Sequence, residues 1–405
     1  MTTWPSPARP DTEQDSEVTH MAPACPDIPI VVLPSDNTVS CRTAPAAPVR
    51  AALTAAVDAL THLQDQLLNP KGAGPALREA LDAAVAGTGR LAAEAAVTPM
   101  DTASLIPIVP NHDYFGVRTA DVDDAYRVSE ISTVIARTLA DLRGARLDLN
   151  DQAAEVRAMV LILKGLSPQD GSPAPEPPAA APAERAPYRV GDDELTRWVI
   201  THHFYFVLNL AAAAAVSRAT AALAGRNRDT AVTALREAAV LVRGFTAAMI
   251  HSGDMSSACY DAMVRPTMQP PAVPAALTGR TQPEHKAFRK AMRKLVAVSA
   301  EPYAELAAVE PEIALARDIL LDADLQDIER HVVITAALVG DDQSIVQGDE
   351  AAESAIAILR TMRHVRATAY YDLMRFGDGV EIVPRTAPRP AGPSDSAASP
   401  QPTVG

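Results

Sequence analysis

The chain has 405 residues, a net charge of −14 and only 4% aromatic residues, and alanine runs are frequent. The acidic balance argues against a nucleic-acid groove, which needs clustered Lys and Arg. Alanine-rich sequence favours helix, because alanine loses no side-chain entropy there. Alternating β-branched and polar residues are rare, so any sheet should be a short ribbon at most. We therefore expect an all-α protein.

The cysteines and the N-terminus narrow the class of protein further. Cys25, Cys41 and Cys259 show no CxxC or CxxCH spacing. This argues against a disulfide framework, a zinc site and CxxCH-type covalent haem attachment. No secretory signal opens the chain, and we expect charges to interrupt the apolar runs before they reach spanning length. The expectation is a cytoplasmic protein with no membrane partner.

Three low-complexity segments divide the chain. Residues 1–45 and 384–405 are rich in Pro, Ser, Thr or Asp and are expected to be disordered. Residues 167–189 are rich in Pro and Ala, which favours an extended linker. The sequence thus predicts two helical blocks, 48–166 and 190–380, with a hinge between them.

In the first block, apolar residues recur at helical spacing. We expect helices over 50–68, 75–97, 119–143 and 150–165. A proline-punctuated loop, 104–118, separates the second helix from the third and carries His112, Tyr114 and Phe115. It is either a lid or a loop that packs its aromatic side chains into the helices beneath.

The second block should open with a long helix capped by Asp192 or Asp193 and ending near Gly225. Further helices are expected over 229–251, 256–264, 283–297, 301–320, 322–338 and 349–375. Pro266 follows directly after one of them, and a proline disfavours helix in the residue before it.

Three segments of the second block carry residues suited to chemistry. His364 lies on the last helix, where a neutral imidazole is a natural axial ligand of haem, although an isolated histidine is more often a surface or core residue. His202 and His203 are adjacent, about 100° apart on a helix. Only one of them can therefore face a buried site as an acid/base or hydrogen-bond donor. Tyr205 and Phe206 follow and could wall that site.

Arg265 closes a helix and precedes a proline. It can either present its guanidinium to a substrate carboxylate or neutralise the carbonyl end of its own helix.

Three other histidines are weaker candidates. They are His251, at a helix C-terminus, His285, in a charged helix start, and His331, which we expect to be solvated. No HExxH, GxSxG, Walker or GxGxxG pattern occurs, which argues against zinc protease, serine hydrolase, NTPase and Rossmann functions.

Taken together, these segments resemble the tryptophan 2,3-dioxygenase superfamily of haem-dependent aromatic oxygenases. In that family a D-E-L stretch precedes a T-H-Q-A-Y-like motif, and here Asp193-Glu194-Leu195 precedes Thr201-His202-His203-Phe204-Tyr205. An Arg five residues before a Pro corresponds to Arg265 and Pro270. The R-x-R-H-x-x-M-V-like segment resembles Thr361–Val365. The resemblance covers about 190–375 and implies a distal His202, a carboxylate-binding Arg265 and a proximal His364.

The chain also departs from the dioxygenases themselves. It lacks their G-T-G-G-S loop and the SGFQ run after the arginine. The resemblance is therefore closer to the branch of tyrosine and 3-methyltyrosine hydroxylases in secondary metabolism. One hydroxylase of that branch attaches haem through an H-x-x-x-C motif, whereas here Thr368 follows His364, which implies non-covalent haem b.

The resemblance implies a cytoplasmic enzyme that hydroxylates a small aromatic substrate, a tyrosine- or tryptophan-type amino acid, with O₂ or H₂O₂. It also implies a homo-oligomer, a dimer or tetramer. Ring-cleaving indole dioxygenation is the alternative chemistry. A haem sensor and a non-catalytic helical interaction protein are the alternatives without turnover.

Overall fold

The computed structural model describes residues 30–69, 74–167, 194–274, 277, 279–340 and 354–375. The described residues from 30 to 374 belong to one compact unit, and the account below concerns that unit. Helices make up nearly all of its regular structure, so the prediction of an all-α fold is confirmed.

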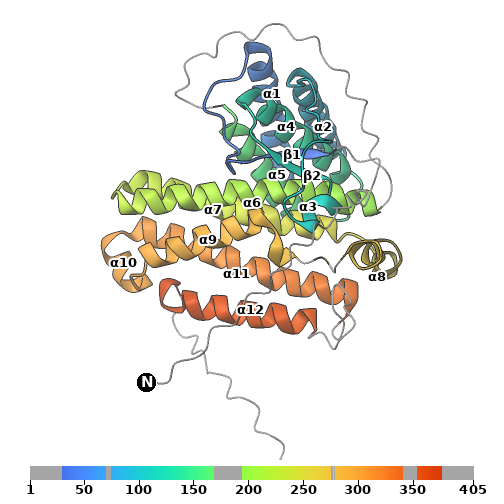
Figure 1. Cartoon of the computed structure of the whole chain (residues 1–405). Coiled ribbons are helices and arrows are strands. Elements are labelled where there is room, and N and C mark those ends of the chain that lie inside the picture. Colours follow the sequence, from blue (N-terminus) through green and yellow to red (C-terminus); the bar gives the residue numbers. More distant parts are fainter. Residues whose placement is uncertain are drawn as a thin grey trace, which may run out of the picture. The chain divides into compact units, whose positions relative to one another are not determined.

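Most of the helices that precede residue 167 form one group at the top of Figure 1, and the short helix over Pro110–Tyr114 is drawn below them. The helices before residue 167 are α1 (Ala47–Leu68), α2 (Pro75–Glu94), the short α3 (Pro110–Tyr114), α4 (Asp124–Leu142) and α5 (Leu149–Gly165). On α1 the leucines 53, 60, 63 and 67 are all buried. This spacing places them on one face of the helix, which packs against its neighbours.

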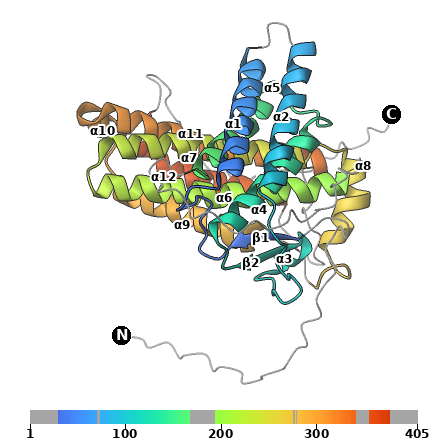
Figure 2. The ribbon, with the colours of Figure 1, turned by 90° about the horizontal axis from the view of Figure 1, so that it is seen from above.

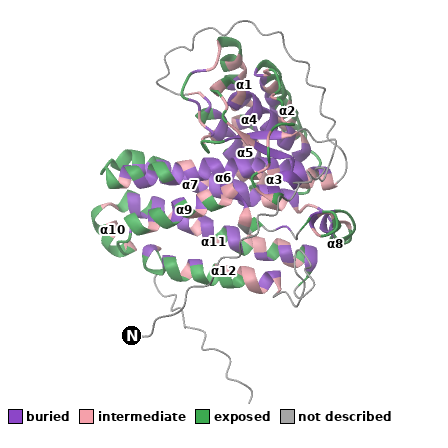
Figure 3. Cartoon of the chain, in the orientation of Figure 1, coloured by how far each residue is buried: buried purple, intermediate pink, exposed green. Residues whose placement is uncertain are grey.

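Two long helices, α6 (Glu194–Ala224) and α7 (Arg228–Ser252), cross the middle of the unit. Viewed from above, α1 and α2 run at a steep angle to them (Figure 2). On the other side lie α9 (Pro283–Val298), α10 (Tyr303–Val309), α11 (Pro311–Val339) and α12 (Ala355–Tyr370). Buried residues concentrate in the central helices, whereas much of α12 is exposed (Figure 3).

Short irregular elements complete the chain between and after the long helices. After α7 come α8 (Ser257–Cys259), a π-helical turn η1 (Tyr260–Val264) and two 3₁₀ turns, η2 (Arg265–Met268) and η3 (Gly279–Thr281). A last 3₁₀ turn, η4 (Tyr371–Leu373), follows α12. The helix predicted over 256–264 is therefore partly π-helical, a form that is rare and often found near functional sites.

A two-stranded parallel ribbon joins the start of the described chain to the loop after α3. It consists of β1 (Val31–Pro34) and β2 (Val117–Ala120), and Val31 pairs with Val117. The Val32 N–H also donates to Glu130 Oε1 at 3.1 Å. The expectation of disorder over 1–45 is therefore wrong for residues 30–45, because the apolar residues Val31, Val32 and Leu33 are buried in this ribbon. Residues 1–29 lie outside the described residues.

Two helix boundaries show what the sequence pattern could and could not predict. Asp123 and Asp148 accept hydrogen bonds from the N–H groups of Tyr126 and Asp151, both at 2.8 Å, and so cap α4 and α5. The break predicted near residue 321 does not exist, because α11 runs unbroken from Pro311. The proposed caps of α6, Asp192 and Asp193, lie outside the described residues, as do the linker from 168 to 189 and the tail at 384–405.

The helix α6 is long and apolar enough to cross a membrane by length and composition, but 67% of its apolar window is buried inside the protein. No Asp, Glu, Lys or Arg occurs between Arg197 and Arg218. The expectation that charges interrupt every apolar run is therefore wrong. The burial explains the apolar sequence without a membrane, because α6 lies in the protein core.

The helices of the two predicted blocks pack directly on each other. Gly244 of α7 faces α5 so closely that a Cβ added to it would lie 2.3 Å from Ala158 Cβ. The missing side chain lets the two backbones approach. The division into blocks 48–166 and 190–380 stays a prediction, but the structure joins their described parts through this contact.

Candidate functional site

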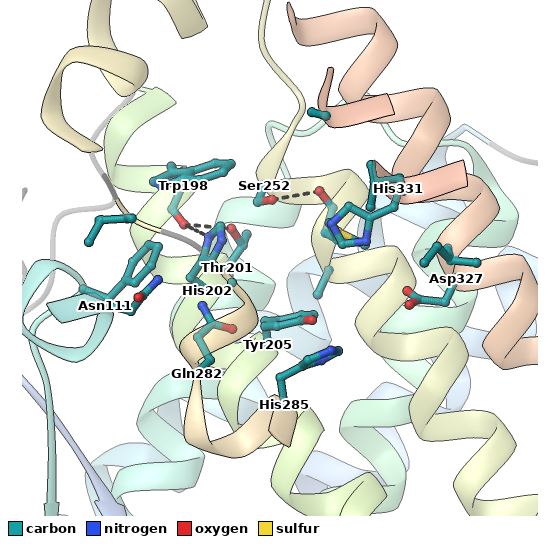
Figure 4. Close-up of a pocket in the computed structure, with 18 of the residues that line it drawn as sticks. Asn111, Trp198, Thr201, His202, Tyr205, Ser252, Gln282, His285, Asp327 and His331 are labelled. Atoms are coloured by element: carbon teal, nitrogen blue, oxygen red, sulfur yellow. Dashed lines mark hydrogen bonds between the residues drawn. The ribbon is translucent and has the colours of Figure 1, made fainter. Parts of the chain in front are cut away.

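A cavity of about 420 Å³ lies among α6, α7, α9, α11 and α12. This volume is in the range of pockets that hold small organic ligands or cofactors. Aromatic and apolar side chains form most of its lining, and three histidines face it: His202 from α6, His285 from α9 and His331 from α11 (Figure 4). A mostly apolar cavity with a few convergent polar groups is the usual form of such a site.

His202 is held in one orientation by its own helix. Its Nδ1 lies 2.6 Å from the carbonyl oxygen of Trp198, one turn earlier, so Nδ1–H donates and Nε2 is left with a lone pair. Burial lowers the pKa of His202 to about 4. His202 is therefore neutral at physiological pH and can accept a proton or bind a metal ion through Nε2.

Two aromatic rings fix the plane of that imidazole. Phe115 stacks on His202 with ring centroids 4.3 Å apart and planes 13° apart. Trp198 lies on α6 with its ring centroid 4.2 Å from that of His202. Phe115 comes from the loop after α3, so the first block supplies part of the cavity wall. These three rings form what we call the aromatic end of the cavity.

The other two histidines are also neutral. Burial lowers the pKa of His285 to about 4 and that of His331 to about 3. His331 enters the cavity from α11, while His202 enters it from α6 (Figure 4). The sequence prediction that His331 is solvated is therefore wrong. Asp327, one turn earlier on α11, faces the same cavity.

The only charged side chains that line the cavity among the described residues are Asp327 and Arg366. Behind them Asp324 is fully buried and accepts hydrogen bonds from Arg289 Nη1 at 2.5 Å and Tyr370 Oη at 2.7 Å. Burial alone would raise the pKa of Asp324, but Arg289 and Arg366 outweigh it and hold that pKa below its ordinary value. We call Asp327 and Arg366 the charged end.

The two predicted wall residues differ in position. Tyr205 lines the cavity, and burial raises its pKa above the ordinary value, so the phenol stays protonated. Phe206 is fully buried and does not line the cavity. It packs instead on Phe115 and His112, with centroids 5.5 and 5.9 Å apart. Phe206 thus supports the wall from behind.

The structure disagrees with His364 as an axial ligand in this cavity. Met362 and Arg366 face the cavity, together with Ile358 one turn before them, and this spacing of four residues defines the inner face of α12. His364 is two positions from each of its neighbours on that face, about 200° around the helix, and its side chain is exposed. A ligand there would point away from the cavity.

Arg265 also lies away from the cavity lining. It begins the 3₁₀ turn η2, and its Nη1 is 3.0 Å from Asp261 Oδ1, one turn earlier. Its guanidinium carbon lies 5.5 Å from the ring centroid of Tyr260. These contacts keep the arginine within its own segment, but they go to a carboxylate and a ring and not to the carbonyl end of the helix that the second alternative named. The carboxylate-binding role of Arg265 is not supported by its position.

The aromatic residues of loop 104–118 pack inward, as the second interpretation of that loop proposes. His112 is fully buried, with Nε2 3.0 Å from Glu284 Oε1 on α9. The Tyr114 hydroxyl is 2.7 Å from Thr267 Oγ1. These contacts anchor the loop and hold Phe115 against His202.

Sequence reasoning ranked His285 and His331 only as weaker candidates and missed Asp327 and Arg366. A signal was present on α11, where polar residues 324, 327, 331 and 335 recur every three or four positions and so share one face of the helix. Such a polar stripe within a core helix indicates a buried polar site. The charged residues next to His331 in sequence, Glu329 and Arg330, obscured it.

Comparison with known proteins places the chain in a family. Residues 32–315 match the family described as SfmD 3-methyl-L-tyrosine peroxygenase. The chain belongs to this family. The match begins in β1 and ends in α11, so the first block belongs to it as much as the second. His331 and α12 lie beyond the matched residues.

One curated relative of the SfmD peroxygenase family is the 3-methyl-L-tyrosine peroxygenase of Streptomyces lavendulae. It is 27% identical over 202 residues, which are 49% of this chain and 53% of the relative. The chain therefore matches about half the length of that relative. The crystal structure of reduced SfmD, soaked with sodium hydrosulfite, aligns with a TM-score of 0.45 and 20% identity over 74% of this chain and 97% of that one.

Membership in the SfmD peroxygenase family confirms the resemblance to the 3-methyltyrosine hydroxylase branch of the haem oxygenases. The donors of the cavity fit a haem. Neutral imidazoles with a free lone pair are its usual axial ligands, and here they stand in a mostly apolar cavity. Among the described residues no group of three or more His, Cys, Asp or Glu is placed to hold a bare metal ion. A haem needs no such group, because the porphyrin supplies the other ligands.

Proposed function

We propose that this chain is a haem-dependent peroxygenase that hydroxylates an aromatic amino acid of the tyrosine type in secondary metabolism. The observation that carries the proposal is the cavity in which His202 and His331 project from two different helices, found in a member of the SfmD peroxygenase family. The reaction would be ArH + H₂O₂ → ArOH + H₂O, in which the substrate carbon is oxidised and the peroxide oxygen reduced. The name of the Streptomyces relative supports 3-methyl-L-tyrosine as the first substrate to test.

His331 would hold the iron of a non-covalent haem b, replacing His364 in that role. Its neutral imidazole supports this, since a protonated ring has no lone pair for iron. Thr335 follows four residues later, and neither Cys41 nor Cys259 lines the cavity. No described cysteine is therefore at hand for a thioether. The haem would supply the oxidising chemistry that no side chain of the cavity can provide.

His202 would act as the proton acceptor. Its Nε2 carries the lone pair, and the Nδ1–H bond to the Trp198 carbonyl together with the Phe115 stack holds the ring in one orientation in the cavity wall. It can take a proton from peroxide or from the substrate phenol and give it to the hydroxide released from peroxide, which then departs as water. Tyr205 would add a neutral hydroxyl to the same cavity.

The test is an absorption spectrum of protein expressed with a haem precursor, ferric and then reduced under CO, for wild type and two variants. We expect a Soret band in wild type and in His364→Ala, and its loss in His331→Ala. His364 is the matched control, because it is an exposed histidine on a neighbouring helix. Normal haem content in His331→Ala would defeat the ligand assignment. A featureless wild-type spectrum, even after hemin addition, would favour a non-catalytic protein.

Turnover separates the chemical alternatives. Haem-loaded protein given H₂¹⁸O₂ and 3-methyl-L-tyrosine or L-tyrosine should yield a product that carries one labelled oxygen atom. L-Tryptophan with O₂, giving a product with two added oxygen atoms, would indicate ring cleavage instead. Haem binding with no turnover of any of these amino acids would support a sensor. Size-exclusion chromatography with light scattering tests the expected homo-oligomer.

A further inference from the structure

The charged end of the cavity holds two opposite charges that the proposed oxidation chemistry does not use. Asp327 and Arg366 come from different helices, α11 and α12, and their side chains approach to 3.9 Å between Asp327 Oδ2 and Arg366 Nη1. Both line the cavity, with Tyr205 and His285 as neighbours in its lining. Each of the two side chains keeps donor or acceptor atoms without a partner.

Arg366 uses only one of its nitrogens within the protein. Nη1 donates to the carbonyl oxygen of Asp324 at 3.2 Å and to Asp324 Oδ1 at 3.3 Å. Nε and Nη2 make no hydrogen bond to a described residue, and the side chain as a whole lines the cavity. The side chain is 9% exposed. A buried guanidinium with two adjacent free N–H groups has the geometry that a carboxylate bridges.

Asp327 likewise has one carboxylate oxygen with a hydrogen-bond partner and one without. Its Oδ1 accepts a hydrogen bond from Thr246 Oγ1 at 2.9 Å. Its Oδ2 has no donor within hydrogen-bonding distance among the described residues, since Arg366 Nη1 lies at 3.9 Å. A carboxylate oxygen in this position would accept a hydrogen bond from an ammonium group. Asp324 cannot do so, because Arg289 and Tyr370 occupy its two oxygens.

We propose that Arg366 and Asp327 bind the zwitterionic head of the amino-acid substrate, Arg366 through its α-carboxylate and Asp327 through its α-ammonium. The inference rests on the proposed function and deepens it, because it names the groups that select a free amino acid. The ring of the substrate would then reach toward the aromatic end, where Phe115, Trp198 and His202 lie. This role takes the place of the one that Arg265 was expected to fill.

The adjacent aspartate also distinguishes the two carboxylates that the cavity could receive. A haem propionate at Arg366 would lie beside the Asp327 carboxylate and be repelled by it. An amino acid brings a cation for Asp327 together with the anion for Arg366, so both charges of the pair are matched. The charge arrangement therefore favours the substrate as the source of the carboxylate.

The test measures binding by calorimetry on haem-loaded protein, with three probes: L-tyrosine, 3-(4-hydroxyphenyl)propanoate, which lacks the ammonium, and tyramine, which lacks the carboxylate. Asp327→Asn should weaken L-tyrosine and tyramine roughly 10- to 100-fold and leave the propanoate unchanged. Arg366→Lys should weaken L-tyrosine and the propanoate and leave tyramine unchanged. Asn keeps an oxygen for Thr246, and Lys keeps the positive charge beside Asp324.

Arg289→Lys is the matched control, since Arg289 binds the same Asp324 but does not line the cavity. It should leave all three affinities unchanged, and thermal unfolding of each variant reports any loss of fold. Equal weakening of all three probes by both variants would overturn the proposal. So would haem loss in Arg366→Lys with unchanged L-tyrosine affinity, which would assign the arginine to a propionate. Absence of a Soret band in wild type would instead count against the proposed function, and the same calorimetry on haem-free protein would still report on the head-group site.

Discussion

His251 Nε2 lies 3.0 Å from Asp141 Oδ2, while its Nδ1 lies 3.2 Å from Glu155 Oε1, so one imidazole bridges two carboxylates in the protein core. The histidine comes from α7 and the carboxylates come from α4 and α5. Burial alone would lower the pKa of His251, but Glu155 and Asp141 outweigh it and raise the pKa to about 9. His251 is therefore a fixed cation that joins the two helical blocks.

The contacts of His251 with Asp141 and Glu155 should make the free energy of unfolding fall as pH rises in the alkaline range. Because the pKa rises from 6.5 in the unfolded chain to about 9 in the folded one, the contribution is complete below pH 6.5 and disappears as pH rises through 9. Urea unfolding should show wild type losing about 3 kcal/mol between pH 7 and 10 beyond the loss in His251→Gln, which cannot titrate. Parallel pH curves for the two proteins would contradict a protonated His251.

His203 should make the free energy of unfolding depend on pH in the acid range. His203 is buried, its Nε2 lies 2.6 Å from the carbonyl oxygen of Phe115, and burial lowers its pKa to about 3. The unfolded chain then binds the proton more readily, so stability falls as pH falls below 6.5. His203→Gln should reduce the slope of unfolding free energy against pH between 6.5 and 4.5 by about 1.4 kcal/mol per unit. The same slope in variant and wild type would show that His203 does not titrate in this way.

The contact of α7 with α5 predicts opposite effects for two glycine substitutions. Gly244→Ala places a Cβ against Ala158 and should lower the free energy of unfolding by about 1–3 kcal/mol. Gly89→Ala, inside α2 with nothing within 4 Å of the added Cβ, should raise it by about 0.5–1 kcal/mol. Chemical denaturation of both variants checks this pair. A neutral Gly244→Ala would mean that the two helices can separate at no cost.

Substitution of His202 should lower the turnover rate and leave haem binding largely intact. His202→Leu is expected to keep its Soret band and to lower kcat with peroxide by about 100-fold or more, because the proton acceptor is removed. The affinity for the amino acid should change little. Phe206→Leu offers the control, since Phe206 lies behind the wall and not in the cavity lining. Loss of haem from His202→Leu alone would assign His202 to the iron.

The sequence predicted the helices well because each has a continuous apolar face within a short stretch of chain. Both His202 and Tyr205 were assigned to the cavity, since a motif on one helix placed them together. His331 and Arg366 were not, because their significance depends on residues brought together by the fold. Arg366 binds Asp324 from 42 positions away, and no local pattern reports that pairing. His364 lies on the exposed face of α12, and a short motif match does not fix the helical phase on which a ligand role depends.

Loop 104–118 shows the same limit. Its prolines and aromatic residues were evident, and the sequence left a lid and an inward-packed loop open, with the inward-packed loop slightly favoured. What decides between them is the pair of His112 with Glu284, which are 172 positions apart in the chain. Such a long-range contact follows from the packing of α3 on α9, which the sequence alone does not fix.

The parallel ribbon has a practical consequence for anyone shortening this protein. Phe115, which completes the aromatic end, lies two residues before β2, and β2 is held by β1 at Val31–Pro34. A fragment that starts at residue 190 would keep His202, His331, Asp327 and Arg366 but would lose the ring that faces His202. Trimming the chain past residue 34 would remove the strand on which that ring depends. The cavity is thus built from both halves of the chain, and neither half alone contains all of its wall.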